Sequence, residues 1–273
     1  MQGLHDFIPT KVKIAYINQL LKVGFDTIDF GSFVSPKAIP QLRDTAEVLA
    51  ALDLDKSNSK LLAIVANKRG AEEAVAYEEI NYLGFPLSIS EEFQKRNTNK
   101  SIADAMSVVS DIQEMVTAKG KEQVVYISMG FGNPYGEAFN DEIVAEFVDR
   151  LVGLGIKNIS LADTIGVAEP EIIKKIFKTS ITAYPTTEIG AHFHSTPDRA
   201  MEKIEAAYQV GCRRFDAAIK GFGGCPMAKD DLTGNLATET LLAYLDSINE
   251  KTSLDRQAFA EAMHKSLNVF PQG

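Results

Sequence analysis

The stretch that decides the fold runs from Asn140 to Asp163 and reads NDEIVAEFVDRLVGLGIKNISLAD. Asn140 is a good helix cap, and the apolar residues after it recur every four positions, which predicts an amphipathic helix over Asp141–Leu154. Glycine ends this helix, and the apolar run Ile159–Asp163 that follows predicts a buried strand. A helix that passes through glycine into a buried strand is the repeating unit of a parallel sheet with crossover helices.

The same unit recurs along the chain, where Val23-Gly24 precedes Ile28-Asp29 and Val210-Gly211 precedes Phe215-Asp216. Helix starts are predicted at Thr10, Ser101, Asn140 and Thr196-Pro197. Seven strands are predicted, at Thr27–Phe33, Leu61–Ala66, Ile80–Leu87, Val124–Met129, Ile159–Asp163, Glu188–His194 and Arg214–Ile219. A closed barrel of this class needs eight strands. We therefore predict an α/β protein, a TIM (β/α)8 barrel that is truncated at its N-terminus, with residues 1–273 as a single incomplete catalytic domain.

Composition limits the partners of the chain. The formal net charge of −9 argues against a nucleic-acid partner and against an anionic membrane surface, and favours a small-molecule partner. The two cysteines, Cys212 and Cys225, lack the CxxC spacing of a thiolate zinc site or a redox motif. No signal peptide and no membrane span is recognisable, so we expect a soluble cytoplasmic protein.

Two histidines at one strand end are the first chemical signal. His192 and His194 alternate with Phe193, so both imidazoles face the same side of the predicted strand. They stand at its carboxyl end, where barrel active sites are assembled. This favours a shared metal ion, with hydrogen-bonded structural histidines as the alternative.

A glycine-rich loop with a thiol is the second signal. Gly221–Pro226 reads GFGGCP and follows the last predicted strand, so it has the freedom to close over a ligand. Cys225 in this loop favours an acid or a nucleophile, with a small buried side chain as the alternative. Cys212, just before the strand, is predicted to be structural.

Polar residues at other strand ends and loops allow two interpretations each. Asp29 and Asp163 stand at the catalytic end of their strands, and either could instead cap the next helix. Asn235, in Gly234–Glu239, could be a helix cap. The basic residues in Glu91–Lys100 are interpreted as part of a long solvated loop or as a site for an anionic ligand.

Five motifs taken together resemble the 3-hydroxy-3-methylglutaryl-coenzyme A lyases. The motifs are Ser32–Lys37 (SFVSPK), Ser160–Val167 (SLADTIGV), His192-x-His194, Gly223–Pro226 (GGCP) and Gly234–Glu239 (GNLATE). The histidine pair and the Gly-Asn are shared with a wider group of metal barrels that act on acyl-coenzyme A, whereas SFVSP and GGCP point to the lyase branch. The resemblance runs through most of the chain.

The resemblance implies a carbon–carbon lyase that cleaves 3-hydroxy-3-methylglutaryl-coenzyme A to acetyl-coenzyme A and acetoacetate. It implies a divalent cation, Mg2+ or Mn2+, with the ligands His192, His194 and Asn235. It further implies that Cys225 protonates the enolate of acetyl-coenzyme A and that His192 accepts the hydroxyl proton. Asp163 and Asp29 would orient the site. The implied substrate contacts are Gln2, Ser160 and Thr164.

The chain departs from the family at its beginning. The family's first strand ends in Arg-Asp-x-x-Gln, and Gln2 matches only the glutamine of this element. We therefore expect that the first strand precedes the sequence and that the chain by itself is weakly active or inactive. The resemblance also implies a homodimer and a role in leucine breakdown. The alternatives are a related metal-dependent aldolase, an acyl-coenzyme A synthase, or a non-catalytic barrel that binds acyl-coenzyme A.

Overall fold

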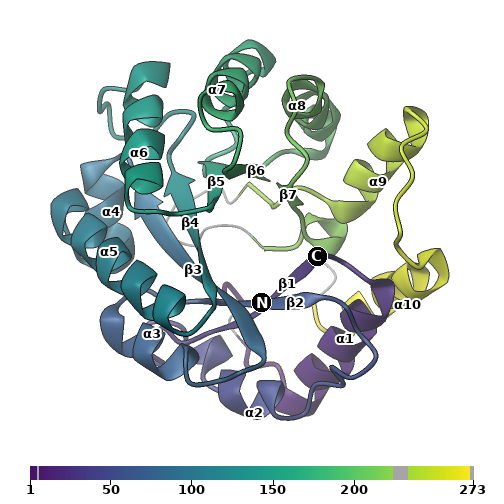
Figure 1. Ribbon diagram of the computed structural model, residues 1–273. Coiled ribbons are helices and arrows are strands. Elements are labelled where there is room, and N and C mark those ends of the chain that lie inside the picture. The colour runs from purple at the N-terminus through teal and green to yellow at the C-terminus, as the bar shows by residue number, and fades with distance from the viewer. Residues whose placement is uncertain (5, 224–232, 271–273) are drawn as a thin grey trace.

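A ring of parallel strands surrounded by helices forms the computed structural model (Figure 1). It describes residues 1–4, 6–223 and 233–270. The strands follow the order β1-β2-β3-β4-β5-β6-β7, and each is parallel to its neighbours. They are β1 Thr27–Ser32, β2 Lys60–Ile64, β3 Ile80–Ser88, β4 Glu122–Ser128, β5 Asn158–Asp163, β6 Glu188–Phe193 and β7 Phe215–Asp216. The predicted barrel architecture, with seven strands present, is confirmed.

Helices cover the outside of the sheet (Figure 1). They are α1 Thr10–Val23, α2 Thr45–Leu49, α3 Lys68–Ala74, α4 Glu91–Thr98, α5 Ile102–Ala118, α6 Asp141–Gly153, α7 Pro170–Ala183, α8 Pro197–Gln209, α9 Thr238–Ser247 and α10 Arg256–Ser266. Two short 3-10 helices, η1 Pro40–Leu42 and η2 Ile219–Gly221, complete the elements. Among the described residues, no helix is long and apolar enough to cross a membrane.

Four local expectations were wrong. Glu91–Thr98 is the helix α4 and not a loop, because the Ser90 hydroxyl accepts a hydrogen bond from the Phe93 amide and starts it. Thr10 and Thr196 make no side-chain cap. Strand β7 is shorter than predicted, because the chain turns into η2, where Lys220 takes a left-handed conformation with φ 58°.

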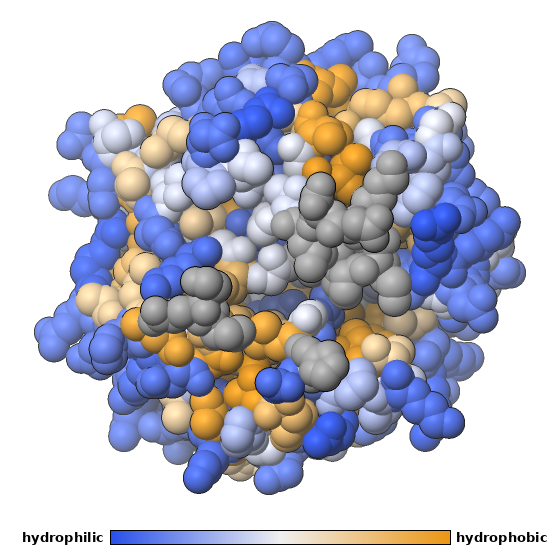
Figure 2. Space-filling view, turned by 180° about the vertical axis from the view of Figure 1, so that it is seen from behind, coloured by the Kyte–Doolittle hydropathy of each residue, from blue (hydrophilic) through white to orange (hydrophobic). Residues whose placement is uncertain are grey.

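The main hydrophobic core lies between the sheet and the outer helices. Leu83, Phe85 and Val125 of β3 and β4 are fully buried and belong to the same core cluster as Val109 and Ile112 of α5. The alternate residues of the same strands face the interior of the ring, which therefore receives polar side chains. Seen from behind Figure 1, the surface is hollowed near its centre, with apolar side chains gathered below the hollow (Figure 2).

The sheet has two edges, β1 and β7, and no ladder joins them within the described residues. Helices α1 and α10 pack together beside this seam. Gln19 of α1 donates its amide to the carbonyl oxygen of Ala258 at 3.1 Å and accepts from Lys265 at 2.8 Å. A strand before Met1 stays a prediction.

One buried side chain fixes the start of the chain. The amide oxygen of Gln41 accepts from the Ile8 amide at 2.8 Å, and its nitrogen donates to the carbonyl oxygens of Leu4 and Asp6 at 3.2 and 2.7 Å. Gln41 is only 3% exposed. Its own carbonyl oxygen accepts from Lys13, which also pairs with Asp44 at 2.7 Å. The segment before α1 is therefore held by a side chain that lies beyond β1.

Replacing Gln41 by leucine is expected to lower the free energy of unfolding by about 1–3 kcal/mol, because a buried backbone amide loses its acceptor. Urea denaturation would measure this. The matched change Gln209→Leu, at an exposed position of α8, is expected to stay within about 0.5 kcal/mol. Equal effects of the two changes on the free energy of unfolding would contradict the role of Gln41 in holding the segment before α1.

Candidate active site

His192 in β6 and His194, directly after this strand, stand side by side at the carboxyl end of the sheet. Their ring centroids are 5.6 Å apart. The Nδ1 atom of His192 lies 3.2 Å from a carboxylate oxygen of Asp216, and that of His194 lies 3.1 Å from the carbonyl oxygen of Thr233. A carbonyl oxygen only accepts, so Nδ1 of His194 carries the proton and Nε2 keeps its lone pair. A partner that fixes the tautomer in this way is the usual arrangement of metal-binding histidines.

Burial keeps His194 neutral. The side chain is 4% exposed, and burial, aided by the neighbouring His192, lowers its pKa to about 3. At neutral pH the imidazole is therefore an unprotonated nitrogen ligand and not a cation. This state suits coordination of a metal ion, which competes with protons for the same lone pair.

Asn235 is brought to the histidine pair from a distant part of the sequence. Its backbone forms an antiparallel bridge with His194, and its side-chain nitrogen donates to the carbonyl oxygen of Phe222 at 2.9 Å. Within the described ranges, no residue donates a hydrogen bond to its amide oxygen. Gly223 permits this approach, because a Cβ at this position would lie 2.7 Å from the Asn235 side chain. Helix α9 begins only at Thr238, so the alternative that Asn235 caps it is excluded.

Two carboxylates lie in the interior of the ring. Asp216 accepts from the Ser160 hydroxyl at 3.2 Å and lies 3.9 Å from Nε of Arg214. Burial would raise the pKa of Asp216, but the hydrogen bond from His192 and the charge of Arg214 outweigh burial and lower it. Asp216 is therefore a carboxylate that orients His192.

Asp29 of β1 is the second carboxylate and behaves differently. Burial, and then the negative charge of Asp216, raise the pKa of Asp29 to about 7. Asp29 is exposed to water, so burial raises its pKa less than it would for a fully enclosed side chain. Repulsion from the negative charge of Asp216 also raises this pKa, whether or not the side chain is buried. Two carboxyl groups of unequal pKa beside a histidine pair are typical of sites that move protons.

Three interior residues of this site were missed by the sequence analysis. Tyr126 of β4 packs edge-on against His192 at 5.2 Å between ring centroids, Asp216 belongs to β7, and Arg214 directly precedes that strand. All three occupy inward-facing positions of predicted strands. Counting alternate residues for polar side chains would have found them.

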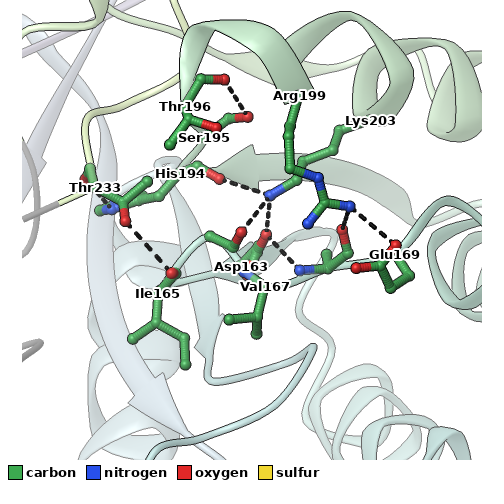
Figure 3. Close-up of polar contacts among 12 residues, drawn as sticks. Asp163, Ile165, Val167, Glu169, His194, Ser195, Thr196, Arg199, Lys203 and Thr233 are labelled. Carbon is green, nitrogen blue, oxygen red and sulfur yellow. Dashed lines mark hydrogen bonds and ion pairs between the residues drawn. The ribbon is translucent and has the colours of Figure 1, made fainter.

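Asp163 lies away from this interior cluster. Its carboxylate accepts from the amides of Val167 and Ala168 at 2.9 and 3.0 Å and pairs with Lys203 of α8 at 2.7 Å (Figure 3). Lys203 also donates to the carbonyl oxygens of Gly166 and His194. Asp163 thus ties the turn after β5 to α8 and to the backbone of His194, and none of its contacts within the described ranges reaches Asp29 or His192.

The remaining predicted site residues are spread over the same end of the ring. Ser160 is fully buried and joins the cluster through Asp216. The Thr164 hydroxyl accepts from the amide of Met129, a residue with φ 59°. Gln2 is exposed near the start of the chain. Cys225 lies outside the described residues.

The donor set at the histidine pair fits a divalent cation. Two imidazole nitrogens and one amide oxygen suit Mg2+, Mn2+ or Zn2+ better than a soft ion, because the described residues of the set include no thiolate. Within the described ranges, no group of three histidine, cysteine or acidic side chains is arranged to hold a metal. Asn235, beside the pair, is therefore the candidate for a third ligand among the described residues.

The paired histidines at a strand end, with a bridged asparagine beside them, agree with a family comparison that covers residues 1–265. The chain belongs to the HMGL-like family. Its HMGL-like relatives include the hydroxymethylglutaryl-CoA lyase YngG of Bacillus subtilis, 33% identical over 94% of this chain and 85% of the relative. The mitochondrial hydroxymethylglutaryl-CoA lyase of Mus musculus is 33% identical over 96% of this chain and 80% of its own length.

Solved HMGL-like structures agree with the fold. The HMG-CoA lyase of Bacillus subtilis superposes with a TM-score of 0.91 at 32% identity, covering 99% of this chain and 91% of the other. An HMG-CoA lyase from Acinetobacter baumannii, in complex with coenzyme A and 3-methylmalate, gives 0.90 at 34% identity, covering 98% and 87%. The predicted family is confirmed.

Proposed function

We propose that the chain is a carbon–carbon lyase that cleaves 3-hydroxy-3-methylglutaryl-coenzyme A (HMG-CoA) to acetyl-coenzyme A and acetoacetate. Support comes from the HMGL-like relatives named lyases and from the histidine pair with its orienting partners at the catalytic end of the ring. The observation that carries the proposal is the pair His192 and His194, of which His194 is kept neutral by burial, with Asn235 beside it.

His192, His194 and Asn235 would hold the divalent cation, which we propose to be Mg2+ or Mn2+. When bound, the cation polarises substrate oxygens and stabilises the negative charge that develops on them. A histidine that gives its lone pair to a cation has none left for a proton. We therefore assign acceptance of the hydroxyl proton to Asp29 and not to His192, since the pKa of Asp29 is about 7.

Loss of that proton lets the carbon–carbon bond break, with the electron pair moving to the thioester as an enolate and the hydroxyl carbon becoming the ketone of acetoacetate. A proton must then return to the enolate carbon. Cys225 is proposed as its donor on the basis of the Gly223–Pro226 motif. Ser160, Thr164 and Gln2 are proposed substrate contacts, and Asp163 positions the backbone of His194.

The test is an assay for acetoacetate and acetyl-coenzyme A, with HMG-CoA and Mg2+ or Mn2+ at high protein concentration, because activity of this chain is expected to be weak. Product should form with the wild-type chain and with His264→Ala, a change in α10 outside the site, and should vanish with His194→Ala. Cleavage of 4-hydroxy-2-oxo acids instead would indicate an aldolase, and thioester binding without turnover a binding-only barrel.

Replacing Asp216 by asparagine tests the orienting contact. Asparagine keeps the size of the side chain but removes the negative charge facing Nδ1 of His192. We expect the affinity for Mn2+ to fall about 10- to 100-fold, the usual effect of changing such a partner. Titration of Mn2+ followed by electron paramagnetic resonance would measure it. Unchanged affinity would mean that His192 is not a ligand.

We further propose a homodimer that acts in the cytoplasm in leucine breakdown, an expectation that rests on the family alone. Light scattering of the purified chain would give its oligomeric state. The net charge of −9 supports the proposal that neither nucleic acid nor a membrane surface is a partner.

A further inference from the structure

Lys203 is a fully buried cation beside the candidate active site (Figure 3). Its side chain is 0% exposed and reaches from the middle of α8 to the turn after β5. An ammonium group has three hydrogens, and Lys203 has three acceptors, which are a carboxylate oxygen of Asp163 at 2.7 Å and the carbonyl oxygens of Gly166 and His194 at 2.9 and 3.1 Å. All three hydrogens are therefore used within the protein, and Lys203 has none to offer a ligand.

Stability alone does not account for this buried ion pair. Taking the charges of Lys203 and Asp163 out of water is costly, and a well-packed apolar pair of the same volume is often as stable or more stable. An apolar pair, however, makes no directional contacts. Hydrogen bonds have preferred distances and angles, so the ammonium group fixes its three acceptors relative to one another. This geometry is what an apolar residue at the position would not supply.

The first effect of Lys203 is on the backbone of His194. The carbonyl oxygen of His194 accepts from Lys203, and its amide donates at 3.1 Å to the carbonyl oxygen of Asp163, the residue that pairs with Lys203. The ring nitrogen Nδ1 faces the carbonyl oxygen of Thr233. In the part of the chain that the structure describes, Nε2 is left as the one polar atom of His194 without a partner. A shift of this backbone would therefore move Nε2.

The second effect of Lys203 reaches the ring of His194 through the turn after β5. Lys203 holds the carbonyl oxygen of Gly166, which has φ 74° and packs so tightly that a Cβ there would lie 2.7 Å from Cγ2 of Thr233. The Thr233 hydroxyl donates to the carbonyl oxygen of Ile165 in the same turn at 3.5 Å. The turn thus supports Thr233, and Thr233 in turn orients the ring of His194.

We propose that Lys203 is a positioning residue of the candidate cation site, where its ammonium group fixes both the backbone of His194 and the direction of its ring. This inference rests on the function proposed above, because His194 is one of the three ligands assigned there. Lys203 acts only through His194 and the turn. In the metal-free chain its effect is a single tautomer of His194, because the Thr233 carbonyl selects the form that carries its proton on Nδ1.

Nitrogen-15 NMR of the metal-free chain, labelled at histidine, tests the effect on the ring. Two-bond proton–nitrogen correlations distinguish the two tautomers, and the signals of His194 are identified by their loss in His194→Ala. The wild-type chain should show the Nδ1–H form alone, and Lys203→Met should show both forms. The control Lys175→Met, which changes an exposed side chain of α7, should match the wild type.

Titration with Mn2+, followed by electron paramagnetic resonance, tests the effect on the site. Because Lys203→Met leaves the charge of Asp163 buried, the titration includes the double variant Lys203→Met with Asp163→Leu, which has no lone charge. Circular dichroism confirms that each variant is folded. Both variants should bind Mn2+ about 10- to 100-fold more weakly, the usual effect of losing a group that orients a ligand. Lys175→Met should bind Mn2+ as the wild type does.

Gly166→Ala tests the route through the turn while Lys203 stays in place. The new methyl group would push against Thr233, so His194 should show both tautomers. Adding Thr233→Ser removes Cγ2, the nearest atom to that methyl group, and should restore part of the Nδ1–H form. A single tautomer in Gly166→Ala would contradict this route.

Wild-type Mn2+ affinity in the folded double variant would overturn the proposal while leaving the lyase assignment intact. A wild-type chain that binds no Mn2+ would instead overturn the cation site of the proposed function, and the positioning of its ligand with it.

Discussion

Replacing Lys203 by methionine is expected to lower the free energy of unfolding by about 3–5 kcal/mol, the usual result of removing one partner of a buried ion pair. The side chains of Lys203 and Asp163 are 0% and 1% exposed. Lys203 uses its ammonium group on three acceptors, which are Asp163 and the carbonyl oxygens of Gly166 and His194 (Figure 3). Methionine fills the same space and leaves the Asp163 charge buried without a cation.

Urea denaturation of four variants, Lys203→Met, Asp163→Leu, the double variant and Lys175→Met, would separate the pair from general effects of substitution. The double change Lys203→Met with Asp163→Leu should be less destabilising than the sum of the single changes, because no lone charge remains. The exposed pair Lys175 and Asp141 provides the control, and Lys175→Met should cost less than about 1 kcal/mol. If Lys203→Met lowered the free energy of unfolding by less than about 1 kcal/mol, this would contradict the role assigned to Asp163 as the buried anchor of this end of the ring.

Replacing Asp29 by asparagine is expected to reduce kcat about 100- to 10,000-fold, the range over which a positioned proton acceptor contributes. Proton acceptance requires the carboxylate form, so wild-type kcat should fall as the pH drops through the pKa of Asp29. That pKa is about 7 without a cation, and a bound cation would lower it. The acid limb of the pH profile should therefore lie at or below pH 7.

The same change should have the opposite effect on stability. The pKa of Asp29 is raised on folding, so the folded chain binds more protons than the unfolded chain between about pH 4 and pH 7. Ionisation of Asp29 therefore lowers the free energy of unfolding as the pH rises from about 4 to about 7, and the loss is complete above pH 7. Asp29→Asn should raise the melting temperature at pH 8 and leave it unchanged at pH 3. A variant that loses both activity and stability at pH 8 would point to a purely structural role.

Much of the fold could be predicted because its signals are local. Glycine before a buried run, as at Gly155, and a capping asparagine, as at Asn140, act within a few residues, and the structure places a helix and a strand where they predict. The error at β7 arose where contacts distant in sequence decide, whereas α4 begins at a local cap, Ser90, that the sequence analysis overlooked. The end of β7 is set by backbone contacts between the Ala218 region and Leu236.

The candidate site divides in the same way. The histidine pair is visible in the sequence because alternate strand residues face one side, and the structure keeps the two rings together. Arg214 lies two positions before Asp216, so alternation along the strand already places them on one side, whereas the fold is what brings Tyr126 of β4 near His192. The buried pairing of Asp163 with Lys203 joins residues 40 positions apart, a distance over which no sequence pattern signals contact.

The backbone bridge between His194 and Asn235 also affects the exchange of a cation bound at the proposed site. Three backbone hydrogen bonds hold the segment that carries Asn235 against β6 and the end of β7. The amide of Leu236 donates to the carbonyl oxygen of Phe193, the amide of Ser195 donates to that of Gly234, and the amide of Ala218 donates to that of Leu236. The same segment supplies the carbonyl oxygen of Thr233 that orients His194. Detachment of this segment would disturb two of the three proposed cation ligands at once, Asn235 and His194. If a cation binds as proposed, a local opening of this segment would therefore also weaken its coordination.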